Sequence, residues 1–161
     1  SRGIQSYSGV KRRFEIKGIC HDVMVVDDYA HHPTEVRVTL DAAKDGWNRR
    51  IIAVFQPHLF TRTRDFYQDF ADAFLIADVL IVTNIFPSRE EPIDGVSGEL
   101  IVYAAQKNNH PKSLYIKEWE HIINSLDKLV KPGDMVITIG AGNIWRFCQE
   151  YFKHLTTKSY L

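Results

Sequence analysis

Short runs of consecutive apolar residues alternate along this chain with longer segments in which apolar residues recur at every third or fourth position. The runs at residues 51–55, 79–82 and 135–139 have the pattern of strands that are buried on both faces of a sheet. Between these runs the apolar residues have helical spacing, as at Phe66 and Phe70. Strands that alternate with helices predict a mostly parallel sheet with helices on both of its faces.

Residues that start or stop elements indicate the remaining boundaries. A helix is predicted to begin at Pro33, because proline at the first helical position has a preset φ and needs no hydrogen-bonded N–H, and to end at Gly46. Apolar runs at 14–16 and 23–26 predict an antiparallel hairpin that turns at residues 17–19. The other predicted elements are helices over residues 98–106, 119–129 and 143–151, a short strand over 114–116 and a long loop over 84–97. The predicted fold is therefore α/β, a Rossmann-like three-layer sandwich with the hairpin at one edge of a mostly parallel sheet.

The length of 161 residues suits one domain, in which residues 1–12 are predicted to be a linker remnant from an upstream domain and residues 13–161 the domain itself. Lysine plus arginine equals aspartate plus glutamate, at 20 each, so the net charge favours neither nucleic acid nor a membrane as a partner. The sequence has no apolar run of the roughly 20 residues that a membrane helix needs, and its start does not resemble a signal peptide. Cys20 and Cys148 are predicted to be buried thiols of a cytoplasmic protein.

Ligands of open parallel sheets bind beyond the carboxyl ends of the strands, which directs attention to the loops at residues 27–33, 56–65 and 140–143. The first loop reads Asp-Asp-Tyr-Ala-His-His-Pro and brings two carboxylates, a phenol and two imidazoles into one strand-to-helix turn. The alternative is that these side chains cap the helix or are solvated. A metal site made of Asp28 and the two histidines is disfavoured, because the spacing is not that of a zinc motif. We therefore predict no metal ligand in this chain.

The second loop holds two arginines, Arg62 and Arg64, just past a buried strand and at the start of a predicted helix. Arginine forms bidentate bonds to carboxylate and phosphate, and helix N-termini favour anions. The alternative is that both side chains are solvated or pair with Asp65 and Asp69. We expect at least one of the arginines to belong to an anion site.

The third loop, Gly140-Ala141-Gly142-Asn143, begins like a dinucleotide-binding fingerprint. Trp145 occupies the position where the third glycine of that fingerprint belongs, so the sequence argues against an NAD site and a dehydrogenase. A tight turn near a ligand is the remaining interpretation. The chain also has no GxxxxGK[ST] motif and so cannot cradle ATP phosphates in that way by itself.

Four motifs in a fixed order resemble the third, C-terminal domain of the Mur ligases, and within that family the member that adds L-alanine to UDP-N-acetylmuramate. The related murein peptide ligase has a similar histidine turn, but Tyr29 and Glu35 are more like the alanine-adding enzyme. The motifs are Gly9-Val10-Lys11-Arg12-Arg13-Phe14-Glu15, the stretch from Asp27 to Glu35, Phe55-Gln56-Pro57-His58 with Thr61-Arg62-Thr63, and Gly140-Ala141-Gly142-Asn143-Ile144.

This resemblance implies a three-domain, ADP-forming amide ligase of peptidoglycan synthesis, and hence of cell wall biogenesis, cell shape and cell division. The first domain is expected to bind UDP, and the central domain to carry the P-loop and the ligands of Mg²⁺. The third domain closes over ATP and the amino acid, so the expected partners of this chain are UDP-N-acetylmuramate, L-alanine, ATP and the upstream domains. The chain alone is expected to be inactive.

The resemblance also implies roles for individual residues. Asp28 is expected to accept hydrogen bonds from the ATP ribose, and Arg62 to bind the carboxylate of L-alanine, with Arg64 as a second candidate. Tyr29 and His31 are expected to line the same pocket, and His31 to orient the amine or take a proton from it. His31 and Arg62 are therefore the predicted catalytic residues.

Other loop residues are expected to surround these groups, while Asp27 is expected to be structural. Leu59 stands where some family members have an arginine, so Arg62 has to carry more of the carboxylate binding here. Asn143 stands where the family often has aspartate, which argues against a charged role for that turn. A free-standing Rossmann-like module that binds a small anion is the competing hypothesis. The predicted site-lining residues are His32, His58, Gly140, Ala141, Gly142 and Asn143.

Overall fold

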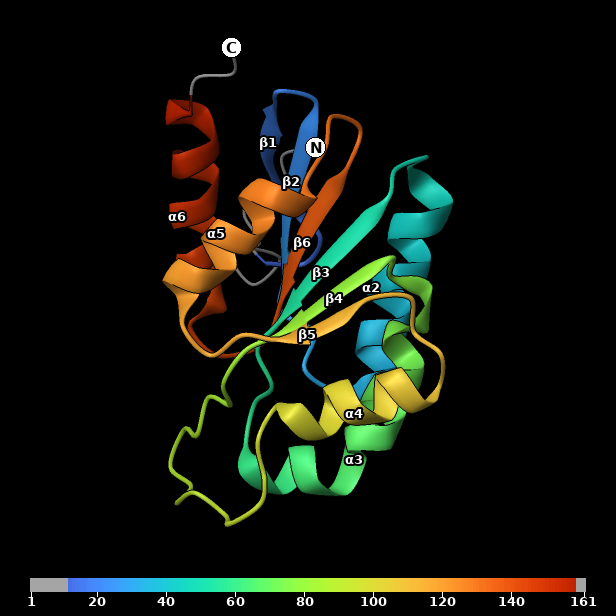
Figure 1. Cartoon of the computed structure of the whole chain (residues 1–161), viewed down its shortest axis with the longest axis vertical. Helices are drawn as coiled ribbons and strands as arrows, with labels where there is room; N and C mark the ends of the chain where they lie inside the picture. The colour runs from blue at the N-terminus through green and yellow to red at the C-terminus, as the bar shows by residue number, and fades with distance from the viewer. Residues whose placement is uncertain (1–11, 159–161) are drawn as a thin grey trace, which may run out of the picture.

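The computed structural model describes residues 12–158, in which six strands form one sheet with the order β1-β2-β6-β3-β4-β5 (Figure 1). β1 pairs antiparallel with β2 at the edge, and the other neighbours are parallel, which confirms the predicted fold class. The predicted linker lies outside the described residues apart from Arg12, and the domain boundary stays a prediction. The elements are β1 (Glu15–Cys20), β2 (Val23–Asp28), α2 (Pro33–Gly46), β3 (Ile51–Phe55), α3 (Phe60–Ala73), η2 (Phe74–Ile76), β4 (Val79–Val82), α4 (Glu99–Lys107), β5 (Ser113–Tyr115), α5 (Trp119–Leu129), β6 (Met135–Ile139) and α6 (Ile144–Thr157).

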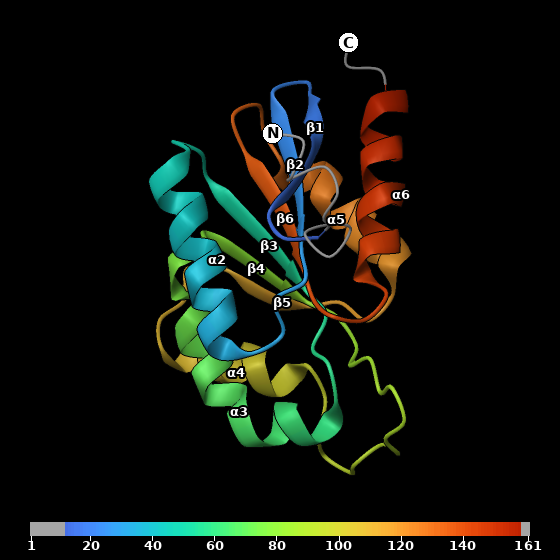
Figure 2. The same ribbon diagram turned by 180° about the vertical axis from the view of Figure 1, so that it is seen from behind.

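Alternate side chains of β2, β3, β4 and β6 enter two different apolar cores. In β3, Ala53 and Phe55 pack with residues of α2, α3 and α4, whereas Ile52 and Val54 pack with residues of α5 and α6. Figures 1 and 2, drawn from opposite sides, show these two groups of helices on opposite faces of the sheet. Because both faces are covered, every residue of β2, β3, β4 and β6 is buried, which explains their continuous apolar runs.

The hairpin turns at a different place from the one predicted. The turn residues are His21 and Asp22, whose φ values of 53° and 58° suit a two-residue hairpin loop. Gly18 lies inside β1 instead, where a Cβ atom would come within 2.6 Å of the Phe152 ring on α6. The prediction of a turn at residues 17–19 was therefore wrong, because this glycine serves the close approach of a helix.

The two cysteines differ in burial. Cys148 on α6 is buried, and its burial raises the pKa of the thiol to about 12. Cys20 ends the edge strand β1 and is only half-buried, so the prediction of two buried thiols was wrong for Cys20. Within residues 12–158, no helix is long and apolar enough to cross a membrane.

The strand order brings the three candidate loops together. β6 lies between β2 and β3, so the loops that follow these strands are neighbours at the carboxyl edge of the sheet. Gly140 N donates a hydrogen bond to the carbonyl of Asp28 over 3.1 Å, and Gln56 N donates to the carbonyl of Ile139 over 3.0 Å. Sequence segments more than 80 residues apart thus form a single edge at which a ligand can bind.

Candidate functional site

The loop between β2 and α2 exposes a phenol beside an imidazole. Tyr29 is 45% exposed, and its ring meets the ring of His31 edge-on, with 5.1 Å between the ring centroids. His31 Nδ1 lies 3.0 Å from the carbonyl oxygen of Tyr29 and 3.5 Å from a carboxylate oxygen of Glu35. Both neighbours of Nδ1 are acceptors, so Nδ1 carries the proton in the neutral ring. The Nε2 atom of His31 is then the acceptor that a ligand can use.

The loop between β3 and α3 brings an arginine and a second histidine to the same place. Arg62 Nη1 lies 3.2 Å from His58 Nδ1, and because a guanidinium only donates, His58 Nδ1 is the acceptor of this bond. Burial, together with the nearby charges of Arg62 and His31, lowers the pKa of His58. The rings of His31 and His58 are 6.1 Å apart, so Tyr29, His31, His58 and Arg62 form one group, which we call the histidine–arginine cluster.

The two arginines of the second loop have different surroundings. Among the described residues, no carboxylate lies within 4.0 Å of the Arg62 guanidinium. Arg64 is exposed and pairs with Asp65, its Nε atom lying 2.9 Å from the carboxylate. The structure therefore brings Arg62 into the histidine–arginine cluster and leaves Arg64 outside it. Of these two arginines, Arg62 is the one without a carboxylate partner among the described residues.

The segment after β4 holds the start of α3 in place. Leu59 N donates to the carbonyl of Phe86 over 2.9 Å, and Leu59 itself has a φ of 75°, which is uncommon for a residue with a side chain. The carboxylate of Glu90 accepts hydrogen bonds from the backbone N–H and the hydroxyl of Thr61, and the hydroxyl bond in particular lowers the pKa of Glu90. The ring of Phe86 stacks on His58 at 5.8 Å. The sequence predicted residues 84–97 only as a loop and did not identify Phe86 or Glu90 as neighbours of the site.

Asp28 lies at the end of β2 and is 7% exposed. Its carboxylate accepts hydrogen bonds from the N–H groups of Ala30 and Phe14, both at 2.8 Å, and from the hydroxyl of Thr39 at 3.2 Å. Burial raises the pKa of Asp28, and these three hydrogen bonds offset part of that shift. Asp28 also lines a pocket of about 390 Å³ together with Arg13, which belongs to the Gly9–Glu15 motif and was not a predicted site residue.

His32 differs from its neighbour His31. It is the N-cap of α2: its ring accepts a hydrogen bond from Thr34 N, and its own backbone N–H donates to Glu35 over 3.0 Å. This arrangement is a capping box, which satisfies the first N–H groups of the helix. His32 thus performs the capping role that the sequence left open for either histidine, and its ring lies 5.1 Å from Phe66.

The turn after β6 is tightly packed. The buried side chain of Gln56 donates to Asn143 Oδ1 over 2.7 Å and accepts from Ile144 N over 3.1 Å, so it ties this turn to β3. A Cβ atom on Gly142 would lie 2.5 Å from the Phe86 ring, and a Cβ atom on Gly140 would lie 2.8 Å from the Gln56 carbonyl. The glycines are therefore required by close packing. Gln56, which the sequence analysis did not assign, connects the loops.

A second hollow opens on the other side of Phe86. It is a cleft of about 590 Å³ between the segment after β4 and the start of α5. Among the described residues, no group of three or more histidine, cysteine, aspartate or glutamate side chains is placed to hold a metal ion. The lining of this cleft includes Gln56, Asn84, Phe86, Lys117, Trp119 and Asn143.

Comparison with known proteins adds to this geometry. A family model described as "Mur ligase, glutamate ligase domain" matches residues 12–142. A UDP-N-acetylmuramate–L-alanine ligase of Geotalea uraniireducens (strain Rf4) is 47% identical over 144 residues, which make up 89% of this chain and 31% of that protein. The chain thus spans about one third of the length of the curated relatives that it matches.

Solved structures agree with the sequence matches. The UDP-N-acetylmuramate-alanine ligase of Thermotoga maritima superposes with a TM-score of 0.68 at 26% identity, over 89% of this chain and 29% of that chain. A murein peptide ligase of Psychrobacter arcticus superposes with a TM-score of 0.79 at 26% identity, over 99% of this chain and 33% of that chain.

Proposed function

Because this chain belongs to the Mur ligase family, we propose that it is the C-terminal domain of an ATP-dependent ligase that joins L-alanine to UDP-N-acetylmuramate in cytoplasmic peptidoglycan synthesis. In this reaction the muramate carboxylate attacks the γ-phosphorus of ATP and becomes an acyl phosphate, with release of ADP. The amine of L-alanine then attacks the acyl carbon, and phosphate leaves from the tetrahedral intermediate. This domain receives the amino acid and helps to enclose the nucleotide.

The observation that carries the proposal is the histidine–arginine cluster, in which Arg62 has donors but no carboxylate partner among the described residues. L-Alanine has only a methyl side chain, so its carboxylate and amine must supply most of its binding energy. A guanidinium matches a carboxylate with two parallel hydrogen bonds. Arg62 is therefore proposed to bind the carboxylate of alanine.

The neighbouring groups suit the amine. Tyr29 is exposed beside His31, and the neutral His31 ring presents Nε2 as an acceptor. An amine has to lose a proton before or during its attack on the acyl phosphate, and an imidazole nitrogen with a free lone pair can accept it. His31 is proposed to orient the amine and to take up that proton, with Tyr29 and His58 closing the pocket around the methyl group.

The pocket that contains Asp28 and Arg13 is proposed to receive part of the nucleotide. A carboxylate has about four acceptor sites, so the three protein hydrogen bonds leave one for a ribose hydroxyl. The exposed Arg13 in the same pocket suits a phosphate. The P-loop and the ligands of Mg²⁺ are proposed to come from the upstream domains. Among residues 12–158, no cluster of three or more histidine, cysteine, aspartate or glutamate side chains could hold the ion.

A second candidate is the murein peptide ligase activity, because the Psychrobacter arcticus structure matches this chain over 99% of its length. That activity uses the same acceptor with a peptide in place of alanine. Curated relatives that are 43–47% identical to this chain are named as alanine ligases, which favours the alanine reaction. The two solved structures are both 26% identical to it and do not distinguish the two reactions.

The test is phosphate release by the longer enzyme that contains this chain. We expect release only when ATP, UDP-N-acetylmuramate and L-alanine are all present, and none from the 161-residue chain alone with the same substrates. Replacing L-alanine with the peptide L-alanyl-γ-D-glutamyl-meso-diaminopimelate distinguishes the two candidates. Turnover with the peptide and not with L-alanine would overturn the proposal.

A further inference from the structure

Arg12 joins two of the loops that form the site. Its Nε atom donates to a carboxylate oxygen of Asp27 over 2.8 Å, and its Nη2 atom donates to the carbonyl of Gly140 over 2.6 Å. The Nη1 atom reaches the carbonyl of Gly142 at 3.5 Å. One planar guanidinium thus bridges the end of β2 and the turn after β6.

The carboxylate that Arg12 neutralises is deeply buried. The Asp27 side chain has no exposed area, and its second oxygen accepts a hydrogen bond from the hydroxyl of Thr138 on β6 over 2.7 Å. Within residues 12–158, Arg12 is the one cation within 4.0 Å of this carboxylate. A buried charge needs such a partner, so the Arg12 side chain is held in one position.

Arg12 also contacts Tyr29 in two ways. The backbone N–H of Tyr29 donates to the carbonyl of Arg12 over 2.5 Å, and the Arg12 guanidinium lies 5.2 Å from the centroid of the Tyr29 ring. A guanidinium at this distance from an aromatic ring is attracted to it. Arg12 therefore contacts the histidine–arginine cluster at Tyr29, and the Tyr29 ring, which is edge-on to His31, separates Arg12 from that histidine.

We infer that Arg12 is a positioning residue for the reaction proposed above, on which this inference rests. It touches none of the proposed reacting groups. It holds Tyr29 and the Gly140–Gly142 carbonyls in one arrangement, so that the loop after β2 and the turn after β6 move as a unit when the domain closes over the substrates. A lysine at this position keeps the charge beside Asp27, but its single nitrogen cannot reproduce the spacing of three bonds that Arg12 makes from three separate nitrogens.

The opposite end of the sheet offers a matched control. Arg50 donates to the carboxylate of Asp134 from Nε and Nη2, over 3.1 Å and 2.8 Å, and to the carbonyl of Leu129 over 2.6 Å. It therefore makes the same kind of bridge, from a buried aspartate to a loop carbonyl, far from the proposed site. Arg12→Lys and Arg50→Lys change the same chemistry at two ends of one domain.

The first measurement is the backbone NMR spectrum of the 161-residue chain. We expect Arg12→Lys to shift the amide signals of Tyr29 and of residues 141–143, and Arg50→Lys to leave these signals in place. This measurement needs no substrate, so it judges the geometric part of the inference whether or not the proposed function holds. Unchanged signals in Arg12→Lys would overturn the inference.

The second measurement is steady-state kinetics of the longer enzyme. If wild-type enzyme does not ligate L-alanine, the proposed function fails, and the NMR result alone stands for Arg12. With an active enzyme, Arg12→Lys should lower kcat and raise the KM for L-alanine, with a combined loss of about 10- to 100-fold in kcat/KM, since small misplacements of binding groups have effects of this order. The KM for UDP-N-acetylmuramate, proposed to bind elsewhere, should not change. Equal losses in Arg12→Lys and Arg50→Lys, in step with the fraction of folded protein, would show a purely structural role and sink the inference.

Discussion

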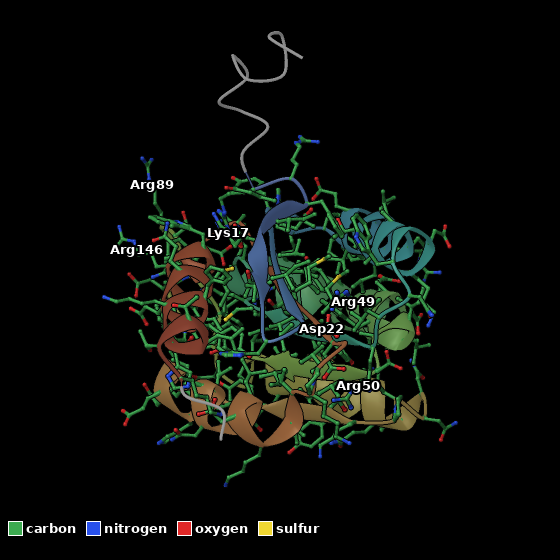
Figure 3. All side chains as sticks on the ribbon, turned by 90° about the horizontal axis from the view of Figure 1, so that it is seen from above. Lys17, Asp22, Arg49, Arg50, Arg89 and Arg146 are labelled. Atoms are coloured by element: carbon green, nitrogen blue, oxygen red, sulfur yellow. The ribbon has the colours of Figure 1, made fainter. Side chains whose placement is uncertain are left out.

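The two ends of the sheet both carry arginines, and they use them differently. At the amino ends of the strands, which face the viewer in Figure 3, Arg49 pairs with Asp22 over 3.0 Å and Arg50 with Asp134 over 2.8 Å. Each of these guanidinium groups also donates to backbone carbonyls. At this end of the sheet, both arginines are paired with aspartates of the same domain.

At the carboxyl ends the arrangement is less complete. Arg12 forms an ion pair with Asp27 and hydrogen bonds to loop carbonyls. Among the described residues, the side-chain hydrogen-bond partner of Arg62 is the His58 ring. Tyr29 is 45% exposed. The pKa of His58 is lowered, so at neutral pH the ring stays uncharged beside the guanidinium. The comparison teaches that an arginine bonded to carboxylate and carbonyls supports the fold, whereas one that faces a neutral ring keeps its charge for a ligand. The following changes test this difference.

Arg62→Lys should have the largest effect. Lysine keeps the charge but loses the two-pronged geometry, and a charge-assisted hydrogen bond contributes about 1.5–3 kcal/mol, equivalent to roughly a 10- to 150-fold rise in the KM for L-alanine. The KM for ATP should change much less. Steady-state kinetics of the longer enzyme checks this expectation.

Arg64→Lys is the control for that experiment, because Arg64 lies on the same helix and pairs with Asp65 at the surface. It should leave the KM for L-alanine within about twofold, since exposed ion pairs contribute little. If Arg62→Lys affects L-alanine and ATP equally, Arg62 positions the domain and does not bind the amino acid. If Arg64→Lys matches Arg62→Lys, the distinction drawn between paired and unpaired arginines is wrong.

The fold could be predicted from the sequence because a parallel strand that is buried on both faces appears as a short run of apolar residues. Ile51–Phe55 and Val79–Val82 are continuous apolar runs because helices cover both faces of the sheet. The hairpin turn could not be located in the same way. A glycine commonly marks a turn, but Gly18 is needed where Phe152 approaches the strand, and that contact depends on the packing of a helix more than 120 residues later.

The sequence predicted which loops form the candidate site, but it did not predict the contacts between those loops. Tyr29, His31 and Arg62 lie together because their strands end at the same edge, which the alternation of strands and helices indicates. The partners of Arg12 and Gln56 depend on β6 lying between β2 and β3, and no local pattern specifies that order. Residues that connect loops across the sheet were missed for this reason.

Gly142→Ala should have an intermediate effect and tests how rigid the carboxyl end is. The new Cβ atom would lie 2.5 Å from the Phe86 ring and 2.6 Å from Gln56 Oε1, so the ring, the amide or the turn must move. Overpacking of this kind costs about 1–3 kcal/mol in the free energy of unfolding. Chemical denaturation of the 161-residue chain measures it.

Gly46→Ala at the end of α2 is the matched control, since nothing lies within 4 Å of its Cβ position. It should raise the free energy of unfolding by about 1 kcal/mol or less, because alanine fits here without a clash and only restricts the unfolded chain. If the two variants have the same free energy of unfolding, the turn after β6 accommodates the extra methyl group by a small shift. In that case the packing of Gly142 against Phe86 would not hold the loops.

The smallest expected effect is the dependence of stability on pH, which compares one histidine from each end of the sheet. His110 is buried just before β5: its Nδ1 atom accepts from Lys112 N over 3.1 Å, and its Nε2 atom donates to the carbonyl of Phe74 over 3.1 Å. Burial lowers the pKa of His110, and burial with the charges of Arg62 and His31 lowers the pKa of His58.

A histidine with a lowered folded pKa binds fewer protons in the folded state than in the unfolded state. Its contribution to stability is therefore present above the ordinary value of 6.5 and is lost as the pH falls from 6.5 through the folded pKa. The free energy of unfolding of the 161-residue chain should fall between pH 7.5 and pH 5 by about 1 kcal/mol or less from each ring, because solvent screens part of each shift.

Arg62→Gln should weaken the part of this slope that belongs to His58, since it removes a neighbouring charge, while the part that belongs to His110 persists. Denaturation curves at several pH values measure both parts, with His58→Gln and His110→Gln assigning each slope to its ring. In His110→Gln, the remaining pH dependence of the free energy of unfolding belongs to His58. If adding Arg62→Gln leaves that dependence unchanged, the arginine does not affect the pKa of His58. The description of the carboxyl end as a neutral ring beside an unpaired arginine would then be wrong.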